Sequence, residues 1–256
     1  MHSLRCLSDQ KEIDLYRERI LERRQKKPVA YITGQKGFHK FEYLVSRRCP
    51  HPKTRNRRLV DYLWKAKEQL TKKRSGEIQI WDLCSGSGCI GLSLAQLIES
   101  SVVTLSDFSE KAIEVSKQNA EKYNLTSVCV YFFVSDLDLS LPKELQFDLI
   151  VSNPPYIPES EKPEIMPDVL EYEPHLALFV SDFKEFHKRL LTAMKSKLKP
   201  GGKLMMETHP LYMDKLESLA EELGFLSRMR ILDSSKKERF FLPKPLLCLK
   251  NIFFIA

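Results

Sequence analysis

The tetrapeptide Asn153-Pro154-Pro155-Tyr156 carries the groups needed to hold a planar NH2 group. Two successive prolines have no backbone N–H to donate, so the carbonyl oxygens of this turn are free to accept hydrogen bonds. The side-chain oxygen of Asn153 is a further acceptor, and the ring of Tyr156 offers a flat face for stacking. We therefore expect Asn153, Pro154 and Tyr156 to act catalytically on an amide or an aromatic amine, with Pro155 completing the substrate clamp. A rigid surface turn, which consecutive prolines often mark, is the alternative.

This turn follows an apolar segment that belongs to a regular alternation of predicted strands and helices from residue 77 onward. Such alternation predicts a parallel sheet covered by helices on both faces. Ligands of these sheets bind at the carboxyl ends of the strands, where the strand order reverses. The expected fold class is therefore α/β, a doubly wound, seven-stranded, mostly parallel, Rossmann-like sheet. The predicted strands span residues 78–83, 102–106, 128–134, 147–151 and 203–207, followed by a closing pair, and the predicted helices span residues 90–98, 110–123, 183–198 and 212–223.

The first predicted strand leads into a turn of small residues, Cys84-Ser85-Gly86-Ser87-Gly88, which opens a helix. We expect Gly86 and Gly88 to let the backbone turn tightly and approach a ligand where a Cβ atom would collide. Residues 86–91 also satisfy the pattern G-x-G-x-x-G. That pattern alone is weak evidence, and it leaves a nicotinamide or flavin enzyme open.

Acidic residues follow the next two predicted strands. Asp107 is placed to accept hydrogen bonds from a ribose diol. Asp136 is placed for the exocyclic amine of an adenine, and Phe108 or Leu137 for its ring. Either acid alone could simply cap a helix. Together, at successive strand ends, they predict a cofactor that contains a nucleoside.

The fourth strand end separates the possible cofactors. A dehydrogenase has no use for an amide clamp there, whereas a methyl donor bound across the first two strand ends would direct its methyl group toward it. This arrangement resembles class I S-adenosylmethionine-dependent methyltransferases, and more narrowly the protein glutamine N5-methyltransferases that modify peptide chain release factors.

Several segments carry the narrower resemblance. Residues 27–34 are similar to the family's linker, residues 38–47 to its small hairpin, residues 153–156 to its substrate clamp, and Glu171-Tyr172-Glu173-Pro174 with Ala177-Leu178 to the loop that follows the clamp. The resemblance implies S-adenosyl-L-methionine as cofactor and a glutamine in the Gly-Gly-Gln tip of a release factor as substrate. With the strand ends above, it places the cofactor on Asp82, Cys84, Ser85, Gly86, Ser87, Gly88, Asp107, Phe108, Asp136, Leu137 and Asn153.

Three departures from the family pattern stand out. Cys84 replaces the glycine that opens the cofactor loop, so either the backbone there avoids a positive φ or cofactor affinity is reduced. Lys53 replaces a glutamate in the segment Pro50-His51-Pro52-Lys53-Thr54. The N-terminal helical domain is shortened to about 26 residues, which puts the family's mode of release-factor docking in question.

The clamp suggests how an amide could be methylated. An amide nitrogen is a poor nucleophile because its lone pair is delocalised into the carbonyl group. If the Asn153 side-chain oxygen and the Pro154 carbonyl oxygen each accept one N–H, they favour a pyramidal nitrogen and oppose the positive charge that develops on it. We assign no general base.

Two other functions stay open. The N6 amine of adenine presents the same planar NH2 group, but a nucleobase must be flipped out and its neighbours read, and only 100 residues follow Tyr156. The acidic segment at residues 171–174 is also poorly suited to phosphate. A protein that keeps the fold and binds partners without turnover is the second alternative.

Charge divides the chain into two parts. Residues 1–75 contain 21 Lys and Arg against 8 Asp and Glu, and residues 76–256 contain 20 against 26, so the difference of +13 and the difference of −6 give the net charge of +7. We expect a basic helix-hairpin-helix segment at residues 1–75 and an S-adenosylmethionine-binding catalytic domain at residues 76–256. The basic clusters in residues 1–75 could bind RNA, a ribosome-associated protein or an acidic partner. They are equally well explained as a solvated surface.

The remaining expectations concern the surroundings of the protein. No apolar segment is long enough to span a bilayer, and residues 252–255 are predicted to form an edge strand. The six cysteines and six histidines show no metal-ligand spacing, so we expect no metal and free thiols. The basic, Arg5-containing start favours a mitochondrial location and a mitochondrial release factor as partner, with a cytoplasmic location as the alternative. We expect no stable nucleic acid binding, and the oligomeric state is not predicted.

Overall fold

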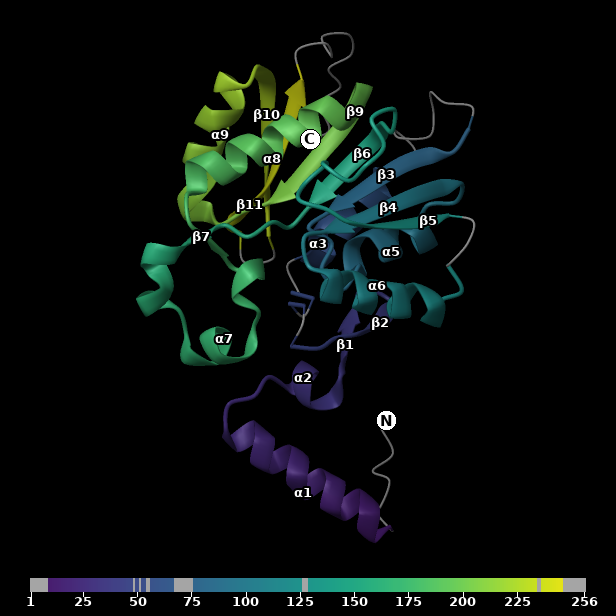
Figure 1. The fold of residues 1–256 in the computed structure, drawn as a ribbon, viewed down its shortest axis with the longest axis vertical. Coiled ribbons are helices and arrows are strands. Elements are labelled where there is room, and N and C mark those ends of the chain that lie inside the picture. The colour runs from purple at the N-terminus through teal and green to yellow at the C-terminus, as the bar shows by residue number, and fades with distance from the viewer. Residues whose placement is uncertain are drawn as a thin grey trace.

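A computed structural model of the protein describes residues 9–47, 49–50, 52–53, 56–66, 76–125, 129–233 and 236–245. Figure 1 shows a twisted central sheet flanked by helices, with an N-terminal helix that projects away from this body. In these ranges no helix is long and apolar enough to cross a lipid bilayer. The predicted edge strand at residues 252–255 lies outside the described residues.

Seven strands of the described chain form the central sheet, in the spatial order β10-β11-β9-β6-β3-β4-β5. The five strands from β9 to β5 are parallel, and β11 and β10 close the sheet as an antiparallel pair. The predicted fold class is confirmed. The strands are β3 (Ile78–Leu83), β4 (Ser101–Asp107), β5 (Val130–Val134), β6 (Phe147–Ser152), β9 (Leu198–Glu207), β10 (Phe225–Leu232) and β11 (Glu238–Pro245).

The strand order reverses between β3 and β6. From β3 the chain runs outward through β4 and β5, and it then returns to the other side of β3 as β6. Leu83, the last residue of β3, pairs with Ser106 in β4 and with Ser152 in β6. The loops that follow these strands therefore leave the sheet side by side, at the place where parallel sheets bind their ligands.

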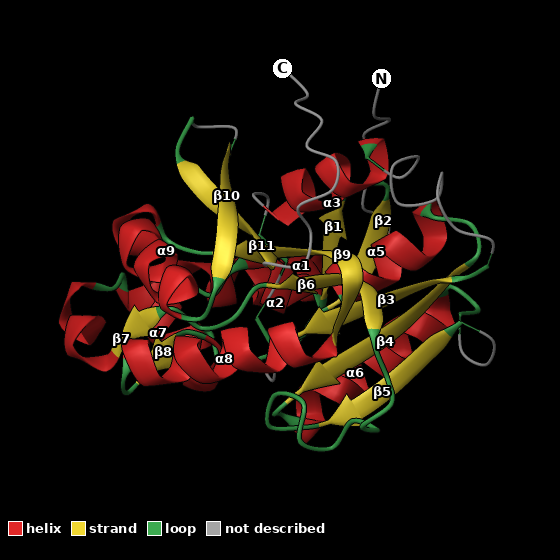
Figure 2. Cartoon of the chain, turned by 90° about the horizontal axis from the view of Figure 1, so that it is seen from above, coloured by secondary structure: helices red, strands yellow, loops and turns green. Residues whose placement is uncertain are grey.

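Helices cover both faces of the sheet and bury two apolar cores. Leu59, Leu92 and Val151 belong to one core, and Trp81 and Leu190 belong to the other. All six residues of β6 are buried, as expected for a strand covered on both faces. Figure 2 shows the sheet between its helices. Three helices pack on the first core, namely α3 (Asn56–Lys65), α5 (Cys89–Leu97) and α6 (Glu110–Lys122). Two pack on the second, namely α8 (Phe183–Lys197) and α9 (Met213–Glu222).

The first core also takes in much of the N-terminal part of the chain. Phe38 and Tyr43 from a small hairpin pack in it, together with Leu59 from α3. The side chain of Asn119 in α6 holds this hairpin, because its Oδ1 accepts from the Leu44 N–H at 2.7 Å and its Nδ2 donates to the Leu44 carbonyl at 3.0 Å. The N-terminal elements are α1 (Gln10–Arg24), α2 (Val29–Thr33), β1 (Gln35–Phe38) and β2 (Phe41–Leu44). The predicted boundary at residue 75 falls among residues 67–75, outside the described chain.

An insertion between β6 and α8 was not predicted from the sequence. Residues 157–180 form short elements that lie beside α8 and α9 in Figures 1 and 2. Prolines at positions 158, 163, 167 and 174 interrupt any long helix or strand, which removes the periodicity on which sequence analysis depends. The elements are β7 (Ile157–Pro158), the 3-10 turn Glu159–Glu164, α7 (Pro167–Tyr172), the 3-10 turn His175–Ala177 and β8 (Phe179–Val180), with a further 3-10 turn at Pro210–Tyr212 before α9.

Candidate active site

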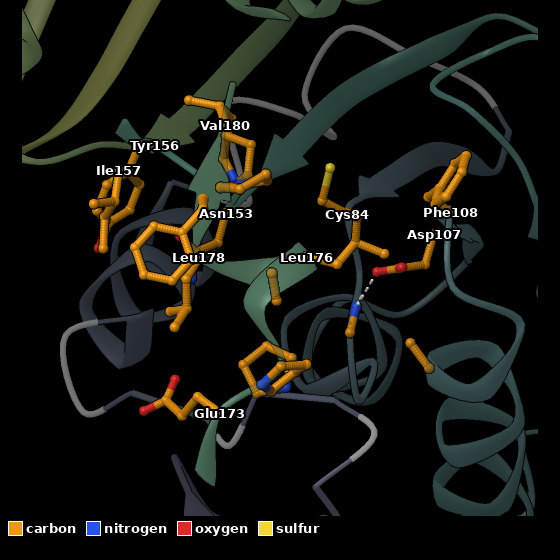
Figure 3. Close-up of a pocket in the computed structure, with 18 of the residues that line it drawn as sticks. Cys84, Asp107, Phe108, Asn153, Tyr156, Ile157, Glu173, Leu176, Leu178 and Val180 are labelled. Atoms are coloured by element: carbon orange, nitrogen blue, oxygen red, sulfur yellow. Dashed lines mark hydrogen bonds between the residues drawn. The ribbon is translucent and has the colours of Figure 1, made fainter. Parts of the chain in front are cut away.

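A cavity of about 760 Å³ opens at the carboxyl ends of β3, β4, β5 and β6. Figure 3 shows that its walls come from these loops and from the insertion, with Cys84 and Asp107 on one side and Asn153 and Tyr156 on the other. The structure thus brings most of the predicted site residues around one space. Those that line it are Cys84, Ser85, Gly86, Ser87, Asp107, Phe108, Asp136, Leu137, Asn153, Pro154, Pro155 and Tyr156.

Asp107 is held from both sides by the backbone. Its Oδ2 accepts from the Gly86 N–H and its Oδ1 from the Ser109 N–H, both at 2.9 Å, and the first bond is drawn in Figure 3. Burial raises the pKa of this carboxyl group. Each carboxylate oxygen retains a second lone pair, so the fixed group suits the two hydroxyls of a ribose.

The predicted adenine contacts differ in their surroundings. Phe108 is 62% exposed although it is aromatic, so its ring is free to cover a planar ligand at the cavity edge. Leu137 is buried and has a φ of 54°. Asp136 accepts a hydrogen bond at 2.6 Å from Nη2 of Arg189 in α8. An adenine amine at Asp136 would share the carboxylate with this guanidinium.

The substrate clamp is held by the insertion. Asn153 directly follows β6 and points into the cavity in Figure 3. The Ile157 N–H donates to the Leu178 carbonyl at 3.0 Å, and this bond fixes the chain just after Tyr156. The Tyr156 ring lies 6.3 Å from the His209 ring, and the His209 ring lies 5.9 Å from the Tyr212 ring, whose hydroxyl donates to Glu161. The clamp therefore has an aromatic wall on one side.

Several buried polar atoms of the cavity lining have no hydrogen-bond partner within the described residues. They include Oδ1 of Asn56, at the start of α3, Oγ of Ser85, in the loop after β3, and Nη1 of Arg239, in β11. A buried polar group without a partner is costly, and a polar ligand can remove that cost. The lining thus fits a ligand with hydrogen-bonding groups as well as a ring.

Comparison with known proteins identifies the family. A family model described as "Methyltransferase small domain" matches residues 67–173. A release factor glutamine methyltransferase of Leptospira interrogans is 42% identical over 234 residues, which cover 91% of this chain and 80% of that protein. Proteins of the same name from Flavobacterium psychrophilum and Clostridium acetobutylicum are 33% and 32% identical and cover 80% and 91% of this chain, and 71% and 81% of their own. The chain belongs to the release factor glutamine methyltransferase family.

Solved structures agree on the fold. The hMettl16 catalytic domain, solved with an RNA hairpin, aligns with a TM-score of 0.63 at 13% identity and covers 82% of this chain and 77% of its own. A Thermus thermophilus 16S rRNA N2 G1207 methyltransferase, solved with AdoMet and guanosine, gives a TM-score of 0.56 at 19% identity, with coverages of 82% and 49%. At these identities the similarity concerns the fold alone.

The protein is a methyltransferase, and its cofactor is S-adenosyl-L-methionine. The residues present fit this cofactor. Asp107 suits the ribose and Phe108 the adenine, while Ser85 and Asn56 offer unpartnered polar atoms to other polar groups of the cofactor. The loop between them presents small residues, so a ligand can lie against its backbone.

Two predicted cofactor residues support the loop of this methyltransferase from behind instead of lining the cavity. Asp82 is fully buried, and its Oδ2 accepts from the Gly91 N–H at 2.7 Å, at the start of α5. A Cβ at Gly88 would lie 2.8 Å from Leu105 and 3.0 Å from Ser116. A side chain at Gly88 would therefore meet the sheet and α6.

Cys84, which stands where the family pattern has a glycine, lies in the left-handed backbone region that favours glycine. Cys84 has a φ of 59°, so the expectation that its backbone might avoid positive φ is wrong. An L-residue in this region costs about 1–2 kcal/mol relative to its usual conformations. Burial raises the pKa of the Cys84 thiol, which favours its neutral form. Whether the cofactor affinity is reduced stays a prediction.

Lys53, which replaces the family's glutamate, has a clear structural role. Its ammonium pairs with Glu173 of the insertion, whose side chain is only 2% exposed. Close by, the Tyr172 hydroxyl donates to the Gln25 carbonyl at 2.9 Å, and the Arg47 guanidinium lies 4.5 Å from the Tyr172 ring centre. These contacts fix the insertion to the N-terminal part of the chain.

Several residues of the site were not found from the sequence. His209, Tyr212, Asn56 and Arg239 all line the cavity, but they come from segments that carry no motif. Only Arg239 had a signal in the sequence, as a charged residue directly before the apolar pair Phe240-Phe241. Within the described chain no group of three acidic, His or Cys side chains is arranged to hold a metal ion.

Proposed function

We propose that this protein transfers a methyl group from S-adenosyl-L-methionine to the side-chain amide nitrogen of a glutamine in the Gly-Gly-Gln tip of a peptide chain release factor. The observation that carries the proposal is the position of Asn153. It faces the same cavity as the loop after β3 and the carboxylate of Asp107, across the switch point of the sheet. The names of the relatives support the same substrate.

The geometry supports methylation of an amide as follows. The bound cofactor supplies a methyl group activated by its sulfonium. The Asn153 side-chain oxygen and the Pro154 carbonyl oxygen accept hydrogen bonds from the two N–H groups of the glutamine. These bonds hold the nitrogen in place and favour a pyramidal geometry, in which the lone pair is localised on the nitrogen. With the cofactor bound, the N–C bond would form as the S–C bond breaks, and one amide proton would leave to water. Alignment of nitrogen, carbon and sulfur in one complex can supply about 7–11 kcal/mol of the barrier.

The insertion favours a peptide over a nucleic acid. It lines the cavity with apolar side chains, among them Met166, Leu176 and Phe179. It also places Glu161 and Glu164 on the same wall. Carboxylates repel phosphate groups, whereas an extended peptide loop carries no such charge. A glutamine in an exposed loop can enter this space by its side chain alone.

We further propose that the substrate is a mitochondrial release factor and that the protein is located in mitochondria. The basic N-terminal residues support it, while the relatives found are bacterial. Microscopy of the full chain, tagged at its C-terminus, tests the location. Colocalisation with a mitochondrial marker is expected, and a diffuse cytoplasmic signal would contradict it.

Methyl transfer from radiolabelled S-adenosyl-L-methionine tests the main proposal. The substrates are a mitochondrial release factor, its cytosolic counterpart, total RNA, and each release factor with the tip glutamine replaced by alanine. We expect label on a release factor and none after the replacement. Label on RNA alone would instead indicate an adenine methyltransferase, and cofactor binding without any transfer would favour a non-catalytic partner-binding protein.

A further inference from the structure

Arg239 is a buried cation at the edge of the candidate active site. It lies at the start of β11, only 8% of its surface is exposed, and it lines the cavity. Its Nε donates to Oδ2 of Asp233 at 3.1 Å. Its Nη1 is buried and has no hydrogen-bond partner anywhere in the described chain.

The surrounding strands place Arg239 at the substrate end of the cavity. Its carbonyl accepts from the Thr208 N–H at 2.8 Å, just beyond the end of β9. The next residue along, His209, contributes the ring that lies 6.3 Å from the ring of Tyr156. β9 in turn pairs with β6, which ends directly before Asn153. The cofactor loops after β4 and β5 lie on the far side of β3 from these strands.

The charge of the guanidinium decides what it can bind. Asp233, whose side chain is 7% exposed, already balances the charge of Arg239. A carboxylate or phosphate at Nη1 would add a second buried negative charge to this pair, whereas a carbonyl oxygen is neutral. An unpartnered buried N–H is costly, and a carbonyl of the substrate removes that cost. The free donor therefore suits a peptide better than a nucleic acid.

A peptide offers Nη1 of Arg239 two kinds of carbonyl group, those of the main chain and that of the glutamine side chain. The side-chain carbonyl is the less suitable of the two. A cation on that oxygen would draw the nitrogen lone pair further into the amide and oppose methyl transfer. We propose that Nη1 of Arg239 binds a main-chain carbonyl oxygen of the release-factor loop, next to the glutamine that is methylated. The proposal rests on the proposed function above, and it assigns to Arg239 the positioning of the loop.

Replacement of Arg239 by lysine tests this proposal. Lysine keeps the charge that Asp233 needs but loses the planar fork of donors. Arg58→Lys is the matched control, because Nη1 of Arg58 donates to the Leu232 carbonyl at 2.9 Å, beside Asp233, and Arg58 does not line the cavity. The measurements are KM and kcat for release-factor methylation at saturating cofactor, the Kd of S-adenosylhomocysteine by calorimetry, and the thermal unfolding midpoint.

We expect Arg239→Lys to raise KM for the release factor by about 10- to 100-fold, with kcat changed less than about threefold. The Kd of S-adenosylhomocysteine should stay within about twofold, and Arg58→Lys should leave all three constants unchanged. An unchanged KM would overturn the proposal, and so would an equal loss of S-adenosylhomocysteine affinity, which would make Arg239 a cofactor residue. If the wild type methylates no release factor, the proposed function itself fails. If the wild type is active and Arg239→Lys is equally active, only this inference fails.

Discussion

At the scale of single residues, the cofactor loop passes through the left-handed backbone region three times. The φ angles are 59° at Cys84, 56° at Gly86 and 76° at Gly88. The space available for a Cβ atom differs between Gly86 and Gly88. A Cβ at Gly86 would meet only Pro50, at 3.7 Å, whereas one at Gly88 would overlap Leu105. The backbone at Cys84 thus adopts a conformation that favours glycine although this residue has a side chain. At Gly88 both the backbone conformation and the close packing require a glycine.

Replacing Gly88 by alanine should destabilise the protein by about 2–4 kcal/mol, since a strained φ and an overpacked contact both contribute. Gly201→Ala is the matched control, because its φ of 78° is nearly the same and nothing lies within 4 Å of the added Cβ. Only the conformational cost of about 1–2 kcal/mol is expected there. Urea unfolding of both variants checks the difference, and equal losses would contradict the packing argument.

The carboxyl group of Asp82 should make stability depend on pH. Burial raises its pKa to about 7, from about 4 in the unfolded chain. The folded state therefore binds more protons between these values, and the contribution of Asp82 to stability is lost as pH rises toward 7. Asp82→Asn removes this titration and keeps an acceptor for the Gly91 N–H.

The free energy of unfolding of Asp82→Asn relative to wild type should increase from pH 5 to pH 7 by up to about 1.4 kcal/mol per pH unit. His187, whose pKa burial lowers to about 4, acts in the opposite direction below pH 6.5. It is present in both proteins, so it cancels in the difference. Urea titrations at pH 5, 6 and 7 that run parallel would refute the role given to Asp82.

At the scale of elements, the insertion at residues 157–180 forms one wall of the cavity and depends on distant segments for its position. The ion pair between Lys53 and Glu173 joins it to the chain just before α3. The backbone bond from Ile157 to Leu178 closes its two ends. A wall of short turns has little regular structure to hold it, so these few contacts decide where it lies.

Lys53→Met should lower the free energy of unfolding by about 2–3 kcal/mol, because it leaves the Glu173 carboxylate buried without this cation. The double variant with Glu173→Gln removes the buried charge as well, so most of the loss should be recovered. Chemical unfolding of the two single variants and the double variant gives the coupling. Additive losses would show that the ion pair does not stabilise the insertion.

The same elements show how much the sequence predicts. β3, β4 and β6 were placed within one residue at each end, because their buried apolar runs are short and bounded by turn residues. The clamp at Asn153 and the carboxylate of Asp107 were found since strand ends share one edge of a parallel sheet. Asn56, His209 and Arg239 were missed, because they reach the cavity only through tertiary packing. Asp82 and Gly88 were assigned to the ligand, but their spacing reflects how the loop packs on the sheet.

At the scale of the whole molecule, the hydrophobic core does not follow the division of charge. Tyr43 and Leu59 are fully buried against the sheet although they belong to the basic part of the chain. α1 differs, because it has no buried residue and projects from the body in Figure 1. Leu15, Tyr16 and Ile20 on it are more than 40% exposed.

Two truncations should therefore behave differently. Deletion of residues 1–24 removes α1, which has no buried residue, and should shift the thermal midpoint by less than about 3 °C, equivalent to about 1 kcal/mol. Deletion of residues 1–75 removes part of the core and should give no cooperative unfolding transition. Calorimetry checks both. A residue 76–256 fragment that folds and binds S-adenosyl-L-methionine would show that residue 75 is a true domain boundary.

Asn153 is the residue proposed to hold the amide nitrogen that receives the methyl group. Single-turnover methyl transfer to a release factor, at saturating cofactor and with the product mapped by mass spectrometry, compares wild type with Asn153→Ala. We expect methylation of the Gly-Gly-Gln glutamine by wild type and a rate lower by about 100- to 1,000-fold in the variant, as for loss of one transition-state hydrogen bond. A variant that methylates the same glutamine within about threefold of the wild-type rate would contradict it.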